Sequence, residues 1–284
     1  MKICGACERE LPEDSYSQEQ GRLRQSIRRC EECVAVGNQL VLMKKSSKRS
    51  EDDDCPICNL PLPLVLGHSC LRACCMKTVC NGCLLAAAKR GMNDCPFCRT
   101  PIARPAAKKE LAMVRKRAKA GDPLAIFHIA TKYDVGHGVA RDVTRALELY
   151  ERAAVLGANE AHFNLGITYY FGTDVKKDIA KAIQHFEAAA MRGHVMSRYN
   201  IGCAEENARN YDLALQHWMI AAMMGYQDAL NKVKEMFMKG FATKADYAEA
   251  LRGYQSAVEE MRSPDRVEAL ALGSDNILSM IRGD

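Results

Sequence analysis

The stretch "EAHFNLGITYYFGTDVKKDIAKAIQHFEAAAMRGH", residues 160–194, determines how most of the chain folds. It is rich in alanine, a glycine divides it into two helix-sized segments, and the second segment carries a central phenylalanine. The residues before and after it repeat this pattern at almost the same interval. We therefore predict helix–turn–helix units that stack into an all-α solenoid.

Three sets of residues define the repeat, and each set takes one residue from every unit. The first set is spaced by 36, 32 and 36 residues. The sets are Ala146, Ala182, Ala214 and Ala250; Tyr150, Phe186, Trp218 and Tyr254; and Ala154, Ala190, Ala222 and Val258. Small residues allow paired helices to approach closely, and we expect the aromatic residue of each unit to fill the space between neighbours.

Glycines mark the expected helix ends, where a left-handed residue closes the last turn. One group of glycines lies three positions after the residues of the third set. The other group lies in the loop between the two helices of a unit. These groups are Gly157, Gly193 and Gly225, and Gly136, Gly172 and Gly240. The third unit lacks four residues and its loop glycine, so we predict a shorter loop there.

The quoted stretch resembles the Sel-1-like repeat, a subclass of the tetratricopeptide-like helical repeats. The resemblance covers about residues 120 to 262, and the fourth unit matches less well. The units are expected at 121–157, 158–193, 194–225 and 226–262. Such repeats imply a concave face that binds a protein ligand.

The cysteines predict a different kind of structure for the beginning of the chain. Thirteen of the fourteen lie in the first 98 residues, mostly as C-x2-C pairs. This spacing lets two thiolates reach one tetrahedral zinc ion. The start of the chain has no apolar core of a signal peptide, and disulfide frameworks are typical of secreted proteins. We therefore expect zinc ions, three in total, in an intracellular protein that is cytoplasmic or nuclear.

The chain thus divides into six parts. We expect a multidomain protein in which small zinc-stabilised modules precede the solenoid. The parts are a four-cysteine zinc finger at 1–36, a charged and solvated linker at 37–54, a second zinc module at 55–103, a basic helix at 104–120, the repeats at 121–262 and a C-terminal cap or tail at 263–284. Small modules of this kind depend on metal for their folding free energy.

The module at 55–103 resembles a RING finger, whose eight ligands bind two zinc ions in a cross-brace. The resemblance implies that Cys55, Cys58, Cys80 and Cys83 bind one ion, and that Cys95 and Cys98 provide half of the next site. The family's histidine position is occupied by Lys77, which has no lone pair to offer a metal.

Four residues are candidates for the missing half of that site. We select Cys74 and Cys75, and Cys70 with Cys74 is the next possibility. His68 is expected to be a bystander.

The RING resemblance also implies contacts to a ubiquitin-conjugating enzyme. Ile57, Leu84, Pro96 and Arg99 occupy the positions that bind this enzyme in the family's ligases. These ligases hold the conjugating enzyme and its thioester-linked ubiquitin in a reactive geometry and form no covalent intermediate themselves. The alternative is that Ile57 and Pro96 only pack the zinc loops.

The first module closes one site with Cys4, Cys7, Cys30 and Cys33, spaced C-x2-C-x22-C-x2-C. It looks like a zinc ribbon or a treble clef, and its "RRCEEC" ending resembles the Stc-1-like domain. Arg22, Arg24, Arg28 and Arg29 are candidates for contacts with nucleic acid or an acidic protein, or are simply solvated.

The predicted basic helix at 104–120 also has two interpretations, a binding surface or a structural helix. It has seven Lys or Arg and one acid. It either binds an acidic partner or nucleic acid, or opens the solenoid with Leu111, Val114 and Ala118 facing the core.

Three functions follow from these observations. The first is a RING-type ubiquitin ligase whose repeats bind a substrate or scaffold. The second is a non-enzymatic adaptor with a structural RING, and the third is a nucleic-acid or chromatin adaptor. The net charge of +5 is too small to indicate nucleic-acid binding by itself. We expect no membrane span and no catalytic residue, with Cys203 as a core side chain.

Overall fold

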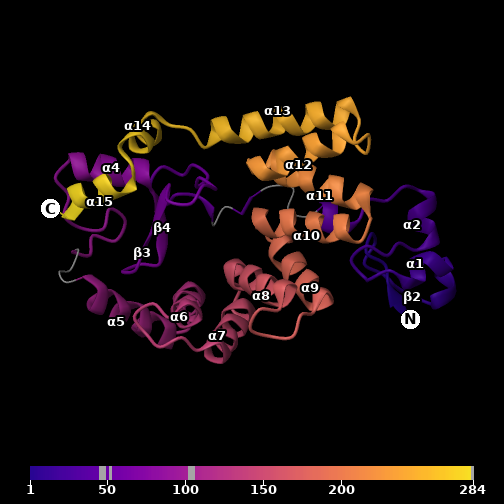
Figure 1. Ribbon diagram of the computed structural model, residues 1–284, viewed down its shortest axis with the longest axis horizontal. Coiled ribbons are helices and arrows are strands. Elements are labelled where there is room, and N and C mark those ends of the chain that lie inside the picture. The colour runs from indigo at the N-terminus through magenta and orange to yellow at the C-terminus, as the bar shows by residue number, and fades with distance from the viewer. Residues whose placement is uncertain (45–48, 51–52, 102–105, 283–284) are drawn as a thin grey trace.

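The computed structural model describes residues 1–44, 49–50, 53–101 and 106–282. Its helices form an arc, and the second zinc module lies between the two ends of that arc (Figure 1). The N-terminal module packs beside the middle of the arc (Figure 1). The chain therefore places one cysteine-rich module at the gap of the solenoid and the other against its helices.

Eight helices in four antiparallel pairs build the repeats. They are α6 (Pro123–Val135), α7 (Val143–Val155), α8 (Asn159–Phe171), α9 (Ile179–Ala190), α10 (Val195–Asn207), α11 (Tyr211–Met223), α12 (Gln227–Met238) and α13 (Lys244–Glu260). The short connection between α10 and α11 confirms the predicted shorter loop of the third unit.

Local capping residues determine where these helices start and stop. The side chains of Asp122, Asp142 and Asp178 accept hydrogen bonds from backbone N–H groups in the first turns of α6, α7 and α9. Gly136 and Gly172 end α6 and α8 in the left-handed conformation, with φ of 73° and 69°. The helix boundaries are therefore encoded locally.

The aromatic residue of each unit packs between helices, as the repeat pattern predicts. Tyr150, Phe186 and Trp218 are each at most 1% exposed. A Cβ atom on Gly166 would lie 2.4 Å from the ring of Phe186, and one on Gly202 would lie 2.5 Å from the ring of Trp218. These glycines are therefore required by the close approach of an aromatic ring.

The fourth unit is the least regular. Ala250 is fully buried, but Val258 is 39% exposed, whereas the alanines at the matching position of the other units are at most 3% exposed. The end of α13 is therefore less covered than the matching helix ends of the other units.

The N-terminal module is a short antiparallel hairpin followed by small helices. Its elements are β1 (Lys2–Ile3), β2 (Glu10–Leu11), a 3-10 turn (Glu13–Ser15), α1 (Gln18–Arg22), α2 (Glu31–Ala35) and α3 (Val41–Lys44). Leu40, Leu42 and Met43 are at most 7% exposed. The expectation of a solvated linker over 37–54 is therefore wrong for this part, because the solenoid covers these apolar side chains. Residues 45–48 and 51–52 of the linker lie outside the described residues.

The second module consists of the antiparallel hairpin β3 (Ser69–Arg72) and β4 (Lys77–Cys80), followed by α4 (Asn81–Lys89). The helix α5 (Ala106–Lys119) then opens the solenoid, with Val114 and Ala118 buried in its core as expected. Residues 104 and 105 of the predicted basic helix lie outside the described residues.

The C-terminal segment forms α14 (Pro264–Leu272) and α15 (Ser274–Arg282). Both helices pack against α4 of the second module (Figure 1). Ala269, Ile277 and Ile281 share a buried cluster with Leu84 and Leu85 of α4. The segment therefore covers the second module and does not extend the solenoid.

Candidate metal centres

Twelve cysteines gather into three groups of four, and in each group the sulfur atoms all lie within 4.8 Å of one another. The groups are Cys4, Cys7, Cys30 and Cys33; Cys55, Cys58, Cys80 and Cys83; and Cys74, Cys75, Cys95 and Cys98. The structure thus brings together the four residues that we assign to each site.

The sulfur separations fit a tetrahedral zinc ion. A Zn–S distance of about 2.3 Å places two sulfurs of a tetrahedron about 3.8 Å apart. The Sγ atoms of Cys55 and Cys83 are 3.8 Å apart, as are those of Cys58 and Cys80. In the third group the Cys75–Cys95 distance is 3.9 Å and the Cys74–Cys98 distance is 3.4 Å. Each group could therefore hold zinc as a closed, structural site.

Three C-x2-C pairs adopt the same backbone turn. In each turn the residue after the second cysteine has a left-handed conformation, with φ of 59° at Glu8, 53° at Asn59 and 60° at Arg99. Its N–H donates to the carbonyl of the first cysteine of the pair at 2.9 Å. This turn points both sulfurs of a pair in one direction, so it preorganises half of each centre.

The other two C-x2-C pairs lie at the start of a helix. Cys30 precedes α2 and Cys80 precedes α4. The backbone N–H of Cys83 donates to the Cys80 sulfur at 3.5 Å. The first turn of α4 therefore contributes a backbone donor to this centre.

The remaining pair, Cys74 and Cys75, occupies the tip of the β3–β4 hairpin. Met76 has a φ of 54°, and its N–H donates to the carbonyl of Arg72 at 2.7 Å. This tight turn lets two adjacent cysteines face the same centre. Cys70 lies on β3, half-buried and outside the groups, and His68 also lies outside them.

The two centres of the second module are interleaved along the chain. The first and third cysteine pairs share one centre, and the second and fourth share the other. Lys77 is exposed beside the hairpin tip. Within the described residues, this alternation is the connectivity expected of a cross-brace.

Three of the four predicted enzyme-contact residues reach the surface. Ile57 is 40% exposed, Pro96 is half-buried, and the side chain of Arg99 is 65% exposed and 3.7 Å from Asp94. Leu84 is only 1% exposed, because it lies in the cluster shared with α14 and α15. Its expected role as a partner contact is therefore wrong for this conformation.

An internal repeat that our sequence reasoning missed relates the two loops that carry Ile57 and Pro96. Residues 54–61, "DCPICNLP", and 94–101, "DCPFCRTP", share the pattern D-C-P-x-C-x-x-P. Each loop is closed by an isolated antiparallel bridge between its aspartate and its last proline. Phe97 is the counterpart of Ile57 and is 44% exposed. The two loops therefore present one apolar side chain each.

Arg266 of α14 is a second residue that sequence reasoning missed. It is 9% exposed and donates to the Cys58 sulfur at 3.3 Å and to the Pro61 carbonyl at 2.7 Å. No local pattern marks it, because its partners lie some 200 positions earlier in the chain. It attaches the C-terminal helices directly to a zinc loop.

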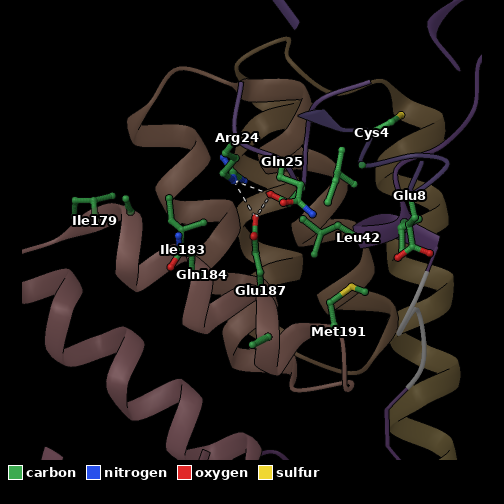
Figure 2. A pocket seen from close by; sticks show the side chains of 16 residues that line it. Cys4, Glu8, Arg24, Gln25, Leu42, Ile179, Ile183, Gln184, Glu187 and Met191 are labelled. Carbon is green, nitrogen blue, oxygen red and sulfur yellow. Dashed lines mark hydrogen bonds and ion pairs between the residues drawn. The ribbon is translucent and has the colours of Figure 1, made fainter. Parts of the chain in front are cut away.

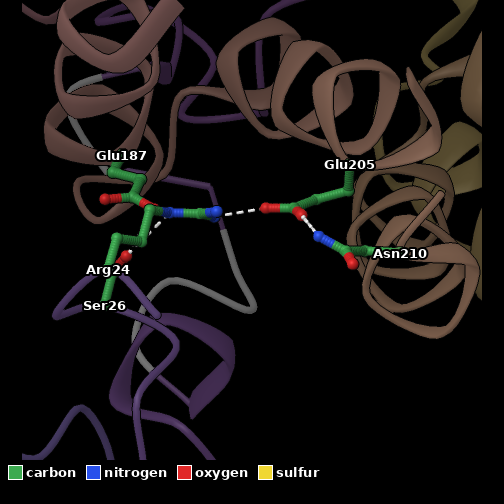
Figure 3. A network of polar contacts seen from close by, with 5 residues as sticks. All are labelled: Arg24, Ser26, Glu187, Glu205 and Asn210. Carbon is green, nitrogen blue, oxygen red and sulfur yellow. Dashed lines mark hydrogen bonds and ion pairs between the residues drawn. The ribbon is translucent and has the colours of Figure 1, made fainter. Parts of the chain in front are cut away.

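The N-terminal module docks on the repeats through Arg24. Its guanidinium lies between Glu187 of α9, at 2.9 Å, and Glu205 of α10 (Figure 3). Ser26 donates to Glu187 at 2.7 Å, and Asn210 donates to Glu205 at 2.7 Å. Glu205 is 1% exposed, and burial raises the pKa of Glu187 although Arg24 and Ser26 oppose this. Arg24 is thus the charge partner of one buried and one half-buried carboxylate.

A cavity of about 700 Å³ lies between this module and α9 (Figure 2). Its walls include Leu42 from the module and Ile183 and Met191 from the α9 side, with Arg24 and Glu187 joined at one side. The packing between the two parts is therefore incomplete around the ion pair.

Two further side chains are buried at this interface: Arg198, which is hydrogen-bonded, and His217, which within the described residues is not. Arg198 is 1% exposed and donates to the carbonyl of Leu42 at 2.6 Å. His217 is fully buried, and neither ring nitrogen has a hydrogen-bond partner among the described residues. Burial, with the charges of Arg198 and Arg24, lowers the pKa of His217 well below its ordinary value. Burial without a described hydrogen-bond partner therefore disfavours the charged form of His217.

The arginines of the first module do not form one free basic surface. Arg24 is used inside the chain, and Arg28 donates to the carbonyl of Leu23 at 2.5 Å. Arg22 is exposed and Arg29 is half-buried. A nucleic-acid surface on this module therefore loses two of its four candidate residues. Burial raises the pKa of Cys203, which fits a core thiol better than a nucleophile.

Within the described residues, no helix is both long and apolar enough to cross a membrane.

Comparison with known proteins identifies the helical part. The Sel1 repeat family model matches residues 123–157, 159–194 and 200–226. The sequence has no match among curated proteins.

Several solved structures are similar in shape. A Sel1 repeat protein from Oxalobacter formigenes is 26% identical over 63% of this chain and 71% of its own, with a TM-score of 0.49. The protective antigen c5321 of uropathogenic Escherichia coli, which displays an SLR fold, is 20% identical over 72% of this chain and 41% of its own, with a TM-score of 0.48. The immunity protein Pa5087 from Pseudomonas aeruginosa is 16% identical over 82% of this chain and 87% of its own, with a TM-score of 0.39. From the family match we conclude that residues 123–226 of this chain contain Sel1 repeats.

Proposed function

We propose that this protein is a RING-type ubiquitin ligase in which the second zinc module recruits a charged ubiquitin-conjugating enzyme and the Sel1 repeats bind a protein substrate or scaffold. The observation that carries the proposal is the interleaving of two four-cysteine centres in residues 55–98. With zinc bound, this arrangement would hold two separate loops rigidly at one surface.

The exposed residues of those loops support a partner-binding surface. Ile57 and Phe97 are 40% and 44% exposed, and Pro96 lies beside Phe97. Apolar side chains on rigid loops are typical of a protein interface. Because α14 and α15 cover the side of α4 that includes Gly82, the enzyme would approach from the loops.

The chemistry requires positioning and no protein nucleophile. In such a ligase a lysine amine of the substrate attacks the thioester carbonyl, and the thiol of the conjugating enzyme leaves. The protein accelerates this step by holding the thioester in one orientation. Arg99 has an exposed guanidinium at the edge of the second loop, where it would contact both ubiquitin and the enzyme.

A non-enzymatic adaptor is the second candidate, and specific observations favour it. Leu84 is buried under the C-terminal helices, and Arg99 already has Asp94 at 3.7 Å. In this alternative the zinc loops bind a protein but accelerate no transfer.

A ubiquitin-discharge assay separates the two functions. Zinc-loaded full-length protein is mixed with a panel of charged conjugating enzymes, and loss of the thioester is followed with time. We expect Ile57→Ala and Arg99→Ala to abolish the acceleration. Val135→Ala and Arg90→Ala are the matched controls, because both side chains are exposed elsewhere and should leave the rate unchanged. Metal analysis of every variant checks that the centres are intact. No acceleration by the wild type with any enzyme of the panel would contradict the ligase and favour the adaptor.

A further inference from the structure

A groove of about 630 Å³ runs along the first three helices of the solenoid, α5, α6 and α7. Five basic residues line it: Arg115, Lys116, Lys119, Arg145 and Arg152. All five are exposed. No aspartate or glutamate lies among the described residues that line the groove.

The basic residues lie on two helices, and their spacing places them along the same groove. On α5, Lys119 lies four positions after Arg115 and three after Lys116, so each of the two shares a face with Lys119. Arg145 and Arg152 are seven positions apart on α7 and share a face in the same way. Residues from α5 and from the first repeat unit therefore build one basic site, which the sequence of 104–120 alone does not reveal.

The floor of the groove is apolar. Ile126 is 1% exposed, and Ile129, Tyr133 and Leu149 are half-buried. The stems of the long basic side chains extend this apolar surface, while their charges stay in water. The groove thus combines an aliphatic floor with a positively charged rim.

The chain neutralises little of this charge itself. Among the described residues, Arg145 pairs with Glu148 at 3.0 Å, and the other four basic residues form no ion pair. Arg117, on the same helix, is used differently, since it donates to the Cys74 carbonyl and pairs with Asp122. Clustered like charges without counter-charges produce a positive potential that attracts an anionic ligand.

We propose that this groove binds an acidic protein segment that also carries apolar side chains. Its carboxylates would pair with the five basic residues, and its apolar side chains would lie on Ile129, Tyr133 and Leu149. The inference rests on the proposed function only in that the repeats bind a protein, and it involves neither zinc loop.

The floor favours protein over nucleic acid. Single-stranded nucleic acids bind through aromatic side chains on which successive bases stack. The floor offers one aromatic residue, Tyr133, among aliphatic ones. Acidic segments, in contrast, are recognised by clusters of arginine and lysine.

Fluorescence polarisation with zinc-loaded full-length protein tests the proposal. The probe is a labelled peptide of alternating glutamate and leucine, compared with polyglutamate, a lysine–leucine peptide and a single-stranded DNA of similar length. We expect the glutamate–leucine peptide to bind most tightly and more weakly at high salt. The double variant Arg115→Glu/Lys119→Glu should weaken its binding about tenfold.

A variant with the same change in net charge provides the control. Lys176→Glu/Lys234→Glu reverses two exposed lysines outside the groove and should leave binding unchanged. Equal loss in both double variants, equal binding of polyglutamate, or tighter binding of DNA would each overturn the proposal. The discharge assay separates this result from the ligase proposal, because the groove variant should retain the wild-type discharge rate and Ile57→Ala should retain peptide binding.

Discussion

The two arginine-rich segments of this chain look alike in sequence and lie in opposite environments in the structure. In the first, Arg24 is enclosed between Glu187 and Glu205 and holds the N-terminal module on the repeats. In the second, Arg115 and Lys119 are exposed along a groove whose described lining includes no acid. The difference is whether the rest of the chain supplies carboxylates at the right place.

This comparison shows that a count of charges does not distinguish an internal contact from a binding surface. Buried carboxylates such as Glu205 must be paired, so an arginine that meets them is committed to the fold. Exposed bases contribute little to stability and remain available to a partner. The following predictions test that division.

Removing the first zinc centre should have the largest effect. Cys30→Ser takes one sulfur from the group that closes the N-terminal module. Zinc binding to a structural site is worth on the order of 10 kcal/mol, so the module should unfold and release Arg24 from its carboxylates. The zinc content measured by metal analysis should fall from three ions to two per chain. Hydrogen exchange should become faster across residues 1–44.

Cys70→Ser is the matched control, since Cys70 is half-buried and belongs to none of the three groups. It should retain three zinc ions. Peptide binding in the groove should survive Cys30→Ser, and its loss would show that the two basic segments are not independent.

Breaking the ion pair alone should have the next largest effect. Arg24→Met leaves Glu187 and the fully covered Glu205 without their charge partner. An uncompensated buried charge costs roughly 3–5 kcal/mol, so the free energy that holds the module on the repeats should fall by about that amount. Hydrogen exchange in the module and denaturant unfolding measure the loss.

Arg22→Met provides the comparison, because Arg22 is exposed in the same module and should change stability by less than about 0.5 kcal/mol. Adding Glu205→Gln to Arg24→Met should recover part of the loss. No recovery would mean that Arg24 acts mainly through packing.

Lowering the pH should weaken the same interface through His217. Its pKa in the folded protein lies well below the ordinary value of 6.5, so below pH 6.5 the unfolded chain takes up a proton that the folded chain does not. The free energy of unfolding should therefore fall as the pH falls through that window, by up to about 1.4 kcal/mol per pH unit for one proton.

His217→Leu should reduce this slope, since it removes the buried imidazole. His185 and His194, whose pKa values burial lowers to about 4, should maintain the remainder. His137→Leu is the control, because His137 is exposed. If the free energy of unfolding falls equally between pH 7 and pH 5 in the wild type and in His217→Leu, His217 does not have this role.

The smallest effect on stability is expected in the groove. Arg115→Glu/Lys119→Glu should change the free energy of unfolding by less than about 0.5 kcal/mol, since both side chains are exposed. A thermal or urea titration provides the measurement. A loss above about 1 kcal/mol would show that these bases are structural, as Arg24 is.

The repeats were predictable because their signals are local. Helix caps, loop glycines and the aromatic residue of each unit lie within one or two helices of their partners. The pairing of the cysteines was predictable for the same reason, since the C-x2-C spacing joins two ligands. Which pairs of the second module share a centre followed only from the resemblance to a RING finger. Even the choice of Cys74 and Cys75 followed from their adjacency at what proved to be a hairpin tip.

The remaining features depend on segments far apart in the chain. Leu84 is buried, and Arg266 reaches Cys58, only because the last helices return to α4. Leu42 and Met43 lie next to a run of charged residues, which predicts that this segment is exposed to solvent. The solenoid nevertheless covers both side chains. The groove likewise needs Arg145 and Arg152 from α7, the second helix after the basic segment.

The return of α14 and α15 to the second module has a mechanical consequence. An ordinary solenoid is open at both ends, so it can change its pitch and curvature as a spring does. Here α5 leaves the second module to start the helical array, and α14 brings the end of the array back to the same module through Arg266 (Figure 1). The array is therefore clamped at both ends by one small domain. Loss of metal from the Cys55 centre would release that clamp, so zinc would set the stiffness of the whole array as well as the fold of one module.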